Sequence, residues 1–223
     1  MPNYTCEYFE TDRGDRPVEE FIDSLQDSTQ RKFFYKKSLL EEFGPRLPFP
    51  HARKLVHDIY ELRFEGPNET GRVLYFFVDG NRIIFTNGFK KKSQKTPEKE
   101  NQSCGAKAGN LFEKKGEVIM ARTNVDRHLE RKLRNSLFRE LYELEMQKAQ
   151  IAKLLIAERA KRGLTQGQLA RKLGVSQQQI SKIENGNFTD LKVVQKVLLT
   201  LGHSIRVVAV PLRSKTRKDL KAA

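Results

Sequence analysis

The segment that most constrains the fold of this chain is TQGQLARKLGVSQQQISKIENG, residues 165–186. It contains two helix N-capping boxes in succession, T-x-x-Q from Thr165 and S-x-x-Q from Ser176, and each box predicts the start of a short helix. Gly174 lies in the turn between these helices, and Gly186 suits the left-handed residue that ends the second one. Apolar residues are spaced to hold the two helices at a fixed angle: Leu169, Ala170, Leu173, Val175, Ile180 and Ile183. The segment therefore predicts a helix-turn-helix.

A helix-turn-helix places its second helix in the major groove of DNA, so the outward residues of that helix are candidate base readers. They are Ser176, Gln177, Gln178, Ser181 and Lys182. Glutamine bonds adenine at N6 and N7, whereas lysine reaches guanine or phosphate. At the start of the first helix, Thr165 and Gln166 are placed to contact backbone phosphate, helped by the helix dipole. The alternative is a helical hairpin that binds only protein, with these polar side chains merely solvated.

Residues 151–201 resemble the Cro/repressor (XRE-type) helix-turn-helix family in these capping boxes and their spacing. The resemblance implies a fold of short helices and a dimer that binds palindromic operator DNA. After the motif, residues 189–201 predict a further helix, and residues 203–210 alternate as a strand does. A terminal strand has unpaired edges, and a second copy of the chain provides a partner symmetrically. We expect a homodimeric DNA-binding domain over residues 151–212, followed by a basic tail over residues 213–223.

The distribution of charge supports a polyanionic partner for this half. The 223 residues carry a formal net charge of +14. Residues 1–119 hold 20 basic and 19 acidic side chains, whereas residues 120–223 hold 22 and 9, which indicates two units with different partners. No apolar run is long enough to span a bilayer, and the N-terminus lacks the apolar stretch of a signal peptide. Two cysteines make neither a disulfide framework nor a zinc site, so we expect a cytoplasmic protein without metal or cofactor.

The first hundred residues predict an α+β domain. One helix starts at Pro17, and a second, capped by Asp27 or Ser28, ends at Gly44. An opening strand is expected near the N-terminus and an antiparallel meander of three strands follows the helices, at residues 3–10, 59–64, 72–78 and 82–86. A weak helix is expected after Pro97, because glycines interrupt its pattern.

Four short motifs follow one another in this half: YELR at residues 60–63, GRVLYFF at 71–77, GFKKK at 88–92 and TPEKE at 96–100. In this order they resemble the RelE-like toxins of the HigB branch, including their phage-derived relatives, over residues 3–113. The resemblance implies two helices packed on a twisted antiparallel sheet. It also implies a metal-independent endoribonuclease that cuts messenger RNA on the ribosome.

Cleavage of this kind requires a base for the proton of a ribose 2′-OH, and cations that stabilise the charge on the phosphoryl oxygens. By resemblance, Arg72 and a member of the run at residues 90–92 occupy phosphate-binding positions, with Arg63 on a neighbouring strand. The candidate catalytic residues are Arg63, Arg72, Lys91, Lys92 and His57, and the candidate RNA-binding residues are Lys54, Lys90 and Lys95. The identity of the base stays open among His57, His51, Lys54 and Glu61.

Residues 114–124 predict a junction, in which Met120 resembles an antitoxin start joined in frame to the end of a toxin. Leucines at helical spacing predict one helix over residues 126–162, and residues 125–150 resemble the N-terminal helix of the HigA antitoxin. The toxin-first order is that of HigB–HigA pairs. We therefore interpret the chain as a fused type II toxin–antitoxin protein. Its first 113 residues cleave messenger RNA, and its second half neutralises them and represses transcription. The alternatives are a repressor with an inactive RelE-like domain and a basic half that binds RNA.

Overall fold

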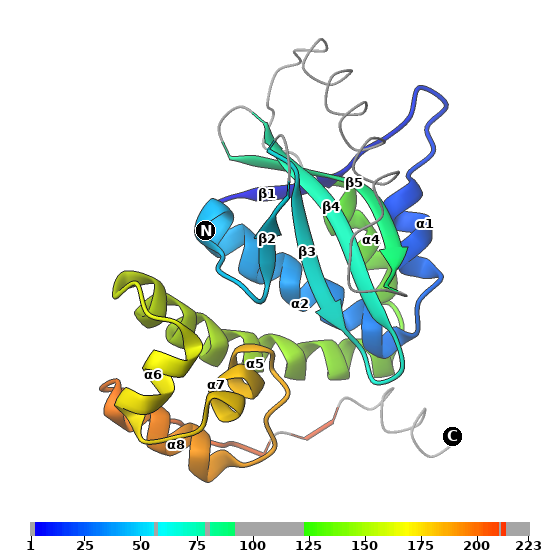
Figure 1. Cartoon of the computed structure of the whole chain (residues 1–223). Coiled ribbons are helices and arrows are strands. Elements are labelled where there is room, and N and C mark those ends of the chain that lie inside the picture. The colour runs from blue at the N-terminus through cyan, green and yellow to red at the C-terminus, as the bar shows by residue number, and fades with distance from the viewer. Residues whose placement is uncertain (1–2, 56–57, 79–80, 92–122, 210, 213–223) are drawn as a thin grey trace. The chain divides into compact units, whose positions relative to one another are not determined.

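The computed structural model describes residues 3–55, 58–78, 81–91, 123–209 and 211–212, and the chain divides into two compact units, Met1–Asn135 and Ser136–Ala223 (Figure 1). The helix expected after Pro97, the junction residues 114–122 and the basic tail lie outside the described residues. The same is true of three candidate site residues, His57, Lys92 and Lys95.

The first unit is built on a five-stranded sheet with the order β1-β5-β4-β3-β2 (Figure 1). Its strands are β1 (Thr5–Tyr8), β2 (Ala52–Lys54), β3 (Tyr60–Glu65), β4 (Thr70–Val78) and β5 (Arg82–Lys90). Strands β3 to β5 form the expected antiparallel meander, β2 adds an unexpected antiparallel strand to it, and β1 runs parallel to β5. The sheet is therefore mixed rather than entirely antiparallel. A parallel pair requires a long connection, and here the chain between β1 and β5 includes both helices and the other three strands.

Helices α1 (Pro17–Asp23) and α2 (Asp27–Phe43) pack on one face of this sheet. The ring of Phe33 lies 5.6 Å from that of Phe64 in β3 and 5.5 Å from that of Phe85 in β5. The start at Pro17 and the stop at Gly44 are as expected, but the cap of α2 is Gln26 rather than Asp27 or Ser28. The N–H of Gln26 donates instead to Glu69. A three-residue 3₁₀ helix (Gly44–Arg46) and the short β2 have no periodic pattern in the sequence.

The long helix expected after the junction is two helices. Helix α4 (Asn124–Lys132) belongs to the first unit, where it contacts β1, and α5 (Ser136–Lys161) begins the second unit. The N–H of Leu133 still bonds to Leu129, and the break falls at residues 133–135. Leucine spacing continues across this break, so periodicity alone did not reveal it.

The second unit is helical. After α5 come α6 (Gln166–Leu173), α7 (Gln177–Glu184) and α8 (Leu191–Thr200), which enclose a core that includes Leu155, Leu169, Ile180 and Val197. Residues 203–209, expected as a strand, form none here. A strand requires a neighbour for its backbone groups, and the N–H of Ile205 donates instead to the side chain of Gln195.

Candidate nucleic-acid interfaces

Charged side chains from three strands of the first unit share the sheet face opposite α1 and α2. In the antiparallel register Arg63 lies opposite Arg72, and Arg53 lies opposite Glu61. Paired residues point to the same face, and these alternate with Leu62 and Phe64, of which Phe64 contacts α2. Lys91 follows two residues after Phe89, which pairs with Arg72, and its N–H donates to Thr70. We call Arg53, Glu61, Arg63, Arg72 and Lys91 the arginine face.

The carboxylate of Glu61 lies between the two guanidinium groups. Its Oε1 is 3.1 Å from Nε of Arg63 and 3.5 Å from Nε of Arg72. The side chain of Arg72 is 2% exposed, and Glu65 is a more distant second carboxylate at 3.9 Å. Burial, followed by repulsion from Arg63, lowers the pKa of Arg72 from its ordinary value. Glu61 and Arg72 are thus the buried charges of a face on which cations outnumber carboxylates.

Two buried donors of this cluster make no hydrogen bond to any residue that the structure describes. The Nε groups of Arg63 and Arg72 are within ion-pair distance of Glu61, but among the described residues neither makes a hydrogen bond of acceptable geometry. Buried polar groups are nearly always bonded, so such exceptions call for an explanation. Guanidinium groups are well matched to phosphate oxygens, which makes this face a candidate phosphate contact.

The other basic candidates do not join this face. Lys54 pairs in register with Tyr60, which points to the opposite side of the sheet, and its Nζ is 2.7 Å from Asp58. Lys90 forms an ion pair with Glu69 at 2.8 Å. His51 is buried, and its Nδ1 lies 2.6 Å from Nζ of Lys36 in α2. Arg53 was not among the residues predicted from the sequence, although strand alternation next to Lys54 is a signal for it.

In the second unit, both expected capping boxes are present. The Oγ1 of Thr165 accepts from the N–H of Gln168 at 3.2 Å, and Gln168 accepts from the N–H of Thr165 at 2.8 Å. Ser176 and Gln179 repeat these bonds at 3.2 and 2.8 Å. Gly174, with φ of 61°, ends α6 in the left-handed conformation. The predicted helix-turn-helix is confirmed as local structure.

The side chains of α7 divide into structural and outward groups. Ser176, Gln177, Gln178 and Lys182 are exposed, whereas Ser181 is half-buried beside Asn185. For Gln177 and Gln178 the described part of the chain provides no side-chain hydrogen bond, so their amides remain available to base edges. Gln166, expected to contact backbone phosphate, here donates from its Nε2 to Glu184 at 2.8 Å.

A buried ion pair fixes α7 to α5. Nε of Arg159 lies 2.7 Å from Oε1 of Glu184, and Nη2 lies 2.9 Å from Oε2. The side chains are 5% and 0% exposed. Such bidentate pairing is directional. It therefore sets the orientation of the candidate recognition helix.

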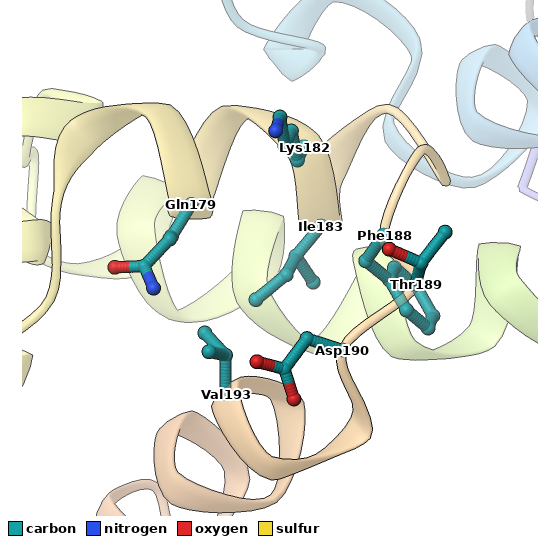
Figure 2. A pocket seen from close by; sticks show the side chains of 7 residues that line it. All are labelled: Gln179, Lys182, Ile183, Phe188, Thr189, Asp190 and Val193. Carbon is teal, nitrogen blue, oxygen red and sulfur yellow. The ribbon is translucent and has the colours of Figure 1, made fainter.

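Figure 2 shows a small hollow beside the same helix, lined by Gln179, Lys182, Ile183, Phe188, Thr189, Asp190 and Val193. Its volume is about 160 Å³. Small-molecule sites usually measure about 300–1,000 Å³. The hollow is thus too small for a typical cofactor, and we assign it no ligand.

Helix α4 is held on the first unit by polar contacts that the sequence analysis did not anticipate. The side chain of Asn124 accepts from the backbone N–H of Tyr8 at 2.7 Å and donates to its carbonyl at 2.9 Å. Because β1 is an edge strand, one amide side chain here takes the place of a neighbouring strand. A T-x-x-D capping box, from Thr123 to Asp126, starts the helix and is the sequence signal that was overlooked.

Charged groups reinforce this contact. Asp126 lies 2.7 Å from Nζ of Lys37, which also pairs with Glu41 at 2.9 Å. Burial lowers the pKa of Lys37, but these carboxylates outweigh burial and the net shift is upward. Arg131 pairs with Glu19, and Lys132 lies 3.3 Å from Asp23. The helix therefore meets α1 and α2 through complementary charge.

His128 is the buried centre of the contact. Its Nδ1 lies 2.9 Å from the hydroxyl of Tyr8, and its Nε2 lies 3.1 Å from Oδ1 of Asp23. A carboxylate only accepts, so Nε2 carries the proton and Tyr8 donates to Nδ1. Burial lowers the pKa of His128, although Asp23 opposes this shift. The docked imidazole is thus favoured in its neutral form.

The two units correspond to two known domain classes. Residues 20–104 match the family described as "Phage derived protein Gp49-like", and residues 155–207 match the helix-turn-helix family. The chain thus carries a domain of the HigB/RelE-like toxin type followed by an XRE-type helix-turn-helix domain, a combination consistent with a toxin–antitoxin fusion. No curated protein matches the chain. Among the described residues, no helix is long and apolar enough to cross a membrane.

Proposed function

We propose that this chain is a cytoplasmic type II toxin–antitoxin fusion. Residues 1–113 cleave messenger RNA on the ribosome, and the second half restrains them and represses transcription at a palindromic operator. The nuclease proposal rests on the buried Nε–H groups of Arg63 and Arg72, which lie beside the carboxylate of Glu61 and make no hydrogen bond within the described part of the chain.

The proposed reaction is a transesterification carried out by side chains of this face. Glu61 takes the proton of the ribose 2′-OH, and the 2′-oxygen attacks the adjacent phosphorus. Arg63 and Arg72 stabilise the charge that develops on the phosphoryl oxygens. Lys91, on the same face, donates a proton to the departing 5′-oxygen. Among the candidate bases that the structure describes, Glu61 is favoured because Lys54 lies on the other face and His51 contacts Lys36. His57, which lies outside the described residues, stays an alternative.

The second half is retained through α4. This helix contacts α1 and α2, so it does not itself cover the arginine face on the other side of the sheet. Docking of α4 therefore anchors the second half rather than blocking the reaction itself. Intramolecular anchoring keeps the effective concentration of the second half near millimolar for a short flexible linker.

The second unit binds DNA as a dimer in this proposal. The exposed amides of Gln177 and Gln178 support base contacts, and Lys182 supports a guanine or phosphate contact. Val207 and Val208 are 72% and 75% exposed on the segment expected as a strand. Pairing with the same segment of a second copy would give its backbone N–H and C=O groups hydrogen-bond partners.

A specific observation favours a second candidate, a repressor whose first domain is inactive. Arg72 is almost fully buried and already faces Glu61 and Glu65. A guanidinium in this position is less available to RNA than an exposed one.

The experiment compares growth and messenger RNA cleavage after induction of the full chain, of residues 1–135, and of residues 1–135 with Glu61→Gln. The boundary at residue 135 keeps α4 with the unit into which it packs. Arrest and cleavage by the fragment alone, abolished by the substitution, are expected. A fragment that is folded by circular dichroism but harmless would favour the inactive-domain alternative.

A further inference from the structure

The loop before β2 displays one large aromatic side chain. Phe49 is 64% exposed, whereas Leu47 is 5% exposed and His51 is fully buried. Prolines at positions 48 and 50 restrict the backbone on both sides of it. The N–H of His51 donates to the carbonyl of Pro48 at 3.0 Å, which closes the loop. The ring is therefore presented on a short, anchored loop.

This loop is joined to the arginine face. The backbone N–H of Arg63 donates to the carbonyl of His51 at 3.0 Å. The guanidinium carbon of Arg63 lies 5.3 Å from the centre of the Phe49 ring. The exposed ring of Phe49 thus lies beside the buried Nε–H donor of Arg63, a group that suits a phosphate oxygen. The exposed Arg53 lies on the same face.

We propose that Phe49 is a base-stacking position for single-stranded RNA. One base stacks on the exposed part of the ring, while an adjacent phosphate binds Arg63. The proposal rests on the proposed function, because it assigns a further RNA contact to the same face. Aromatic rings beside a cationic track are the general means by which proteins hold unpaired strands, and stacking tolerates any base. The neighbouring arginines favour a polyanion over an apolar protein segment as the occupant.

The absence of tryptophan from the sequence allows a direct test. Phe49→Trp in the full chain introduces a single fluorophore at the proposed position. The probe is a short single-stranded RNA with 2′-O-methyl groups, which cannot be cleaved because its nucleophile is blocked. The comparison probe has the same phosphates but abasic residues in place of the bases.

We expect the 2′-O-methyl RNA to quench the fluorescence of the tryptophan and the abasic probe to quench it little. Tyr60→Trp, whose side chain points to the other face of the sheet, is the matched control and is expected to show no such difference. In the original sequence, which has no tryptophan, Phe49→Ala is expected to weaken binding of the 2′-O-methyl RNA by about 5- to 150-fold relative to Phe49→Tyr. Equal effects of both probes, or equal affinities of both variants, would overturn the assignment.

The outcome is separable from the cleavage reaction. Quenching does not require a base catalyst, so it is expected to persist with Glu61→Gln. Base-dependent quenching without any cleavage of messenger RNA would support base stacking on Phe49 and refute the proposed nuclease activity. Cleavage without base-dependent quenching would refute the stacking position alone. An apolar protein partner at Phe49 would give no quenching by either probe.

Discussion

The ion pair between Arg159 and Glu184 permits a quantitative prediction for the DNA-binding unit. Replacing Glu184 by glutamine keeps the shape of the side chain but removes its charge. In the unsubstituted chain three donor groups converge on the carboxylate of Glu184, two from Arg159 and one from Gln166. The replacement amide has one oxygen for these three donors. It also leaves a guanidinium that is 5% exposed without its counter-charge.

Breaking a buried pair on one side costs about 3–5 kcal/mol. That corresponds to a factor of at least about 100 in the unfolding equilibrium. For a unit of the size of Ser136–Ala223, the midpoint of thermal unfolding is expected to fall by at least about 12 °C. Hydrogen exchange of the α7 amides measures the effect locally, so unfolding of the first unit does not obscure it.

Glu158→Gln is the matched control, because this carboxylate pairs with Arg162 at 2.9 Å and both side chains are more exposed than the Arg159–Glu184 pair, at 28% and 48%. An exposed pair contributes about 0–1 kcal/mol. Replacing Arg159 and Glu184 together by methionine is expected to cost less than either single change, since no buried charge remains. If Glu184→Gln destabilised the unit no more than Glu158→Gln, the buried pair would not hold α7 as we describe.

Three further predictions concern the other contacts. Docking of α4 is expected to be complete above about pH 6.5 and to weaken below it. Burial lowers the pKa of His128 in the docked state, so the undocked chain binds a proton more readily and acid favours undocking. Hydrogen exchange of the α4 amides across pH measures this, and His128→Gln is expected to remove the dependence near pH 6. Gln177→Ala or Gln178→Ala is expected to lose about 1–3 kcal/mol of DNA-binding free energy at one base pair. Lys182→Ala, if the lysine contacts phosphate, is expected to weaken binding to all DNA sequences alike and to reduce the slope of log affinity against log salt by about one unit. Competition binding at two salt concentrations checks this, and identical behaviour of the two classes would contradict the groove assignment. Arg63→Ala is expected to reduce messenger RNA cleavage by about 10²–10³-fold, and Lys54→Ala, on the other face, to leave it unchanged. A comparable loss from both would argue against the arginine face.

Features decided by neighbouring residues were predictable from the sequence. The capping boxes at Thr165 and Ser176 join residues three positions apart, so the sequence contains both partners of each bond. The stop at Gly44 and the antiparallel meander were predictable for the same reason. The predicted meander also placed Arg63 and Arg72 on neighbouring strands. The register of the two strands in the structure places the two residues directly opposite each other.

Features that join distant residues were decided only by the tertiary structure. Asn124 bonds the edge of β1 across 116 positions, and no local pattern records that contact. The break between α4 and α5 follows from it, because α4 packs into the first unit while the leucine spacing runs on unchanged. The position of Glu61 between two arginines depends likewise on how β3 and β4 align. Sequence patterns thus determined which local elements form, and long-range packing determined which of their side chains meet, because hydrogen bonds and ion pairs act over only a few ångströms of space.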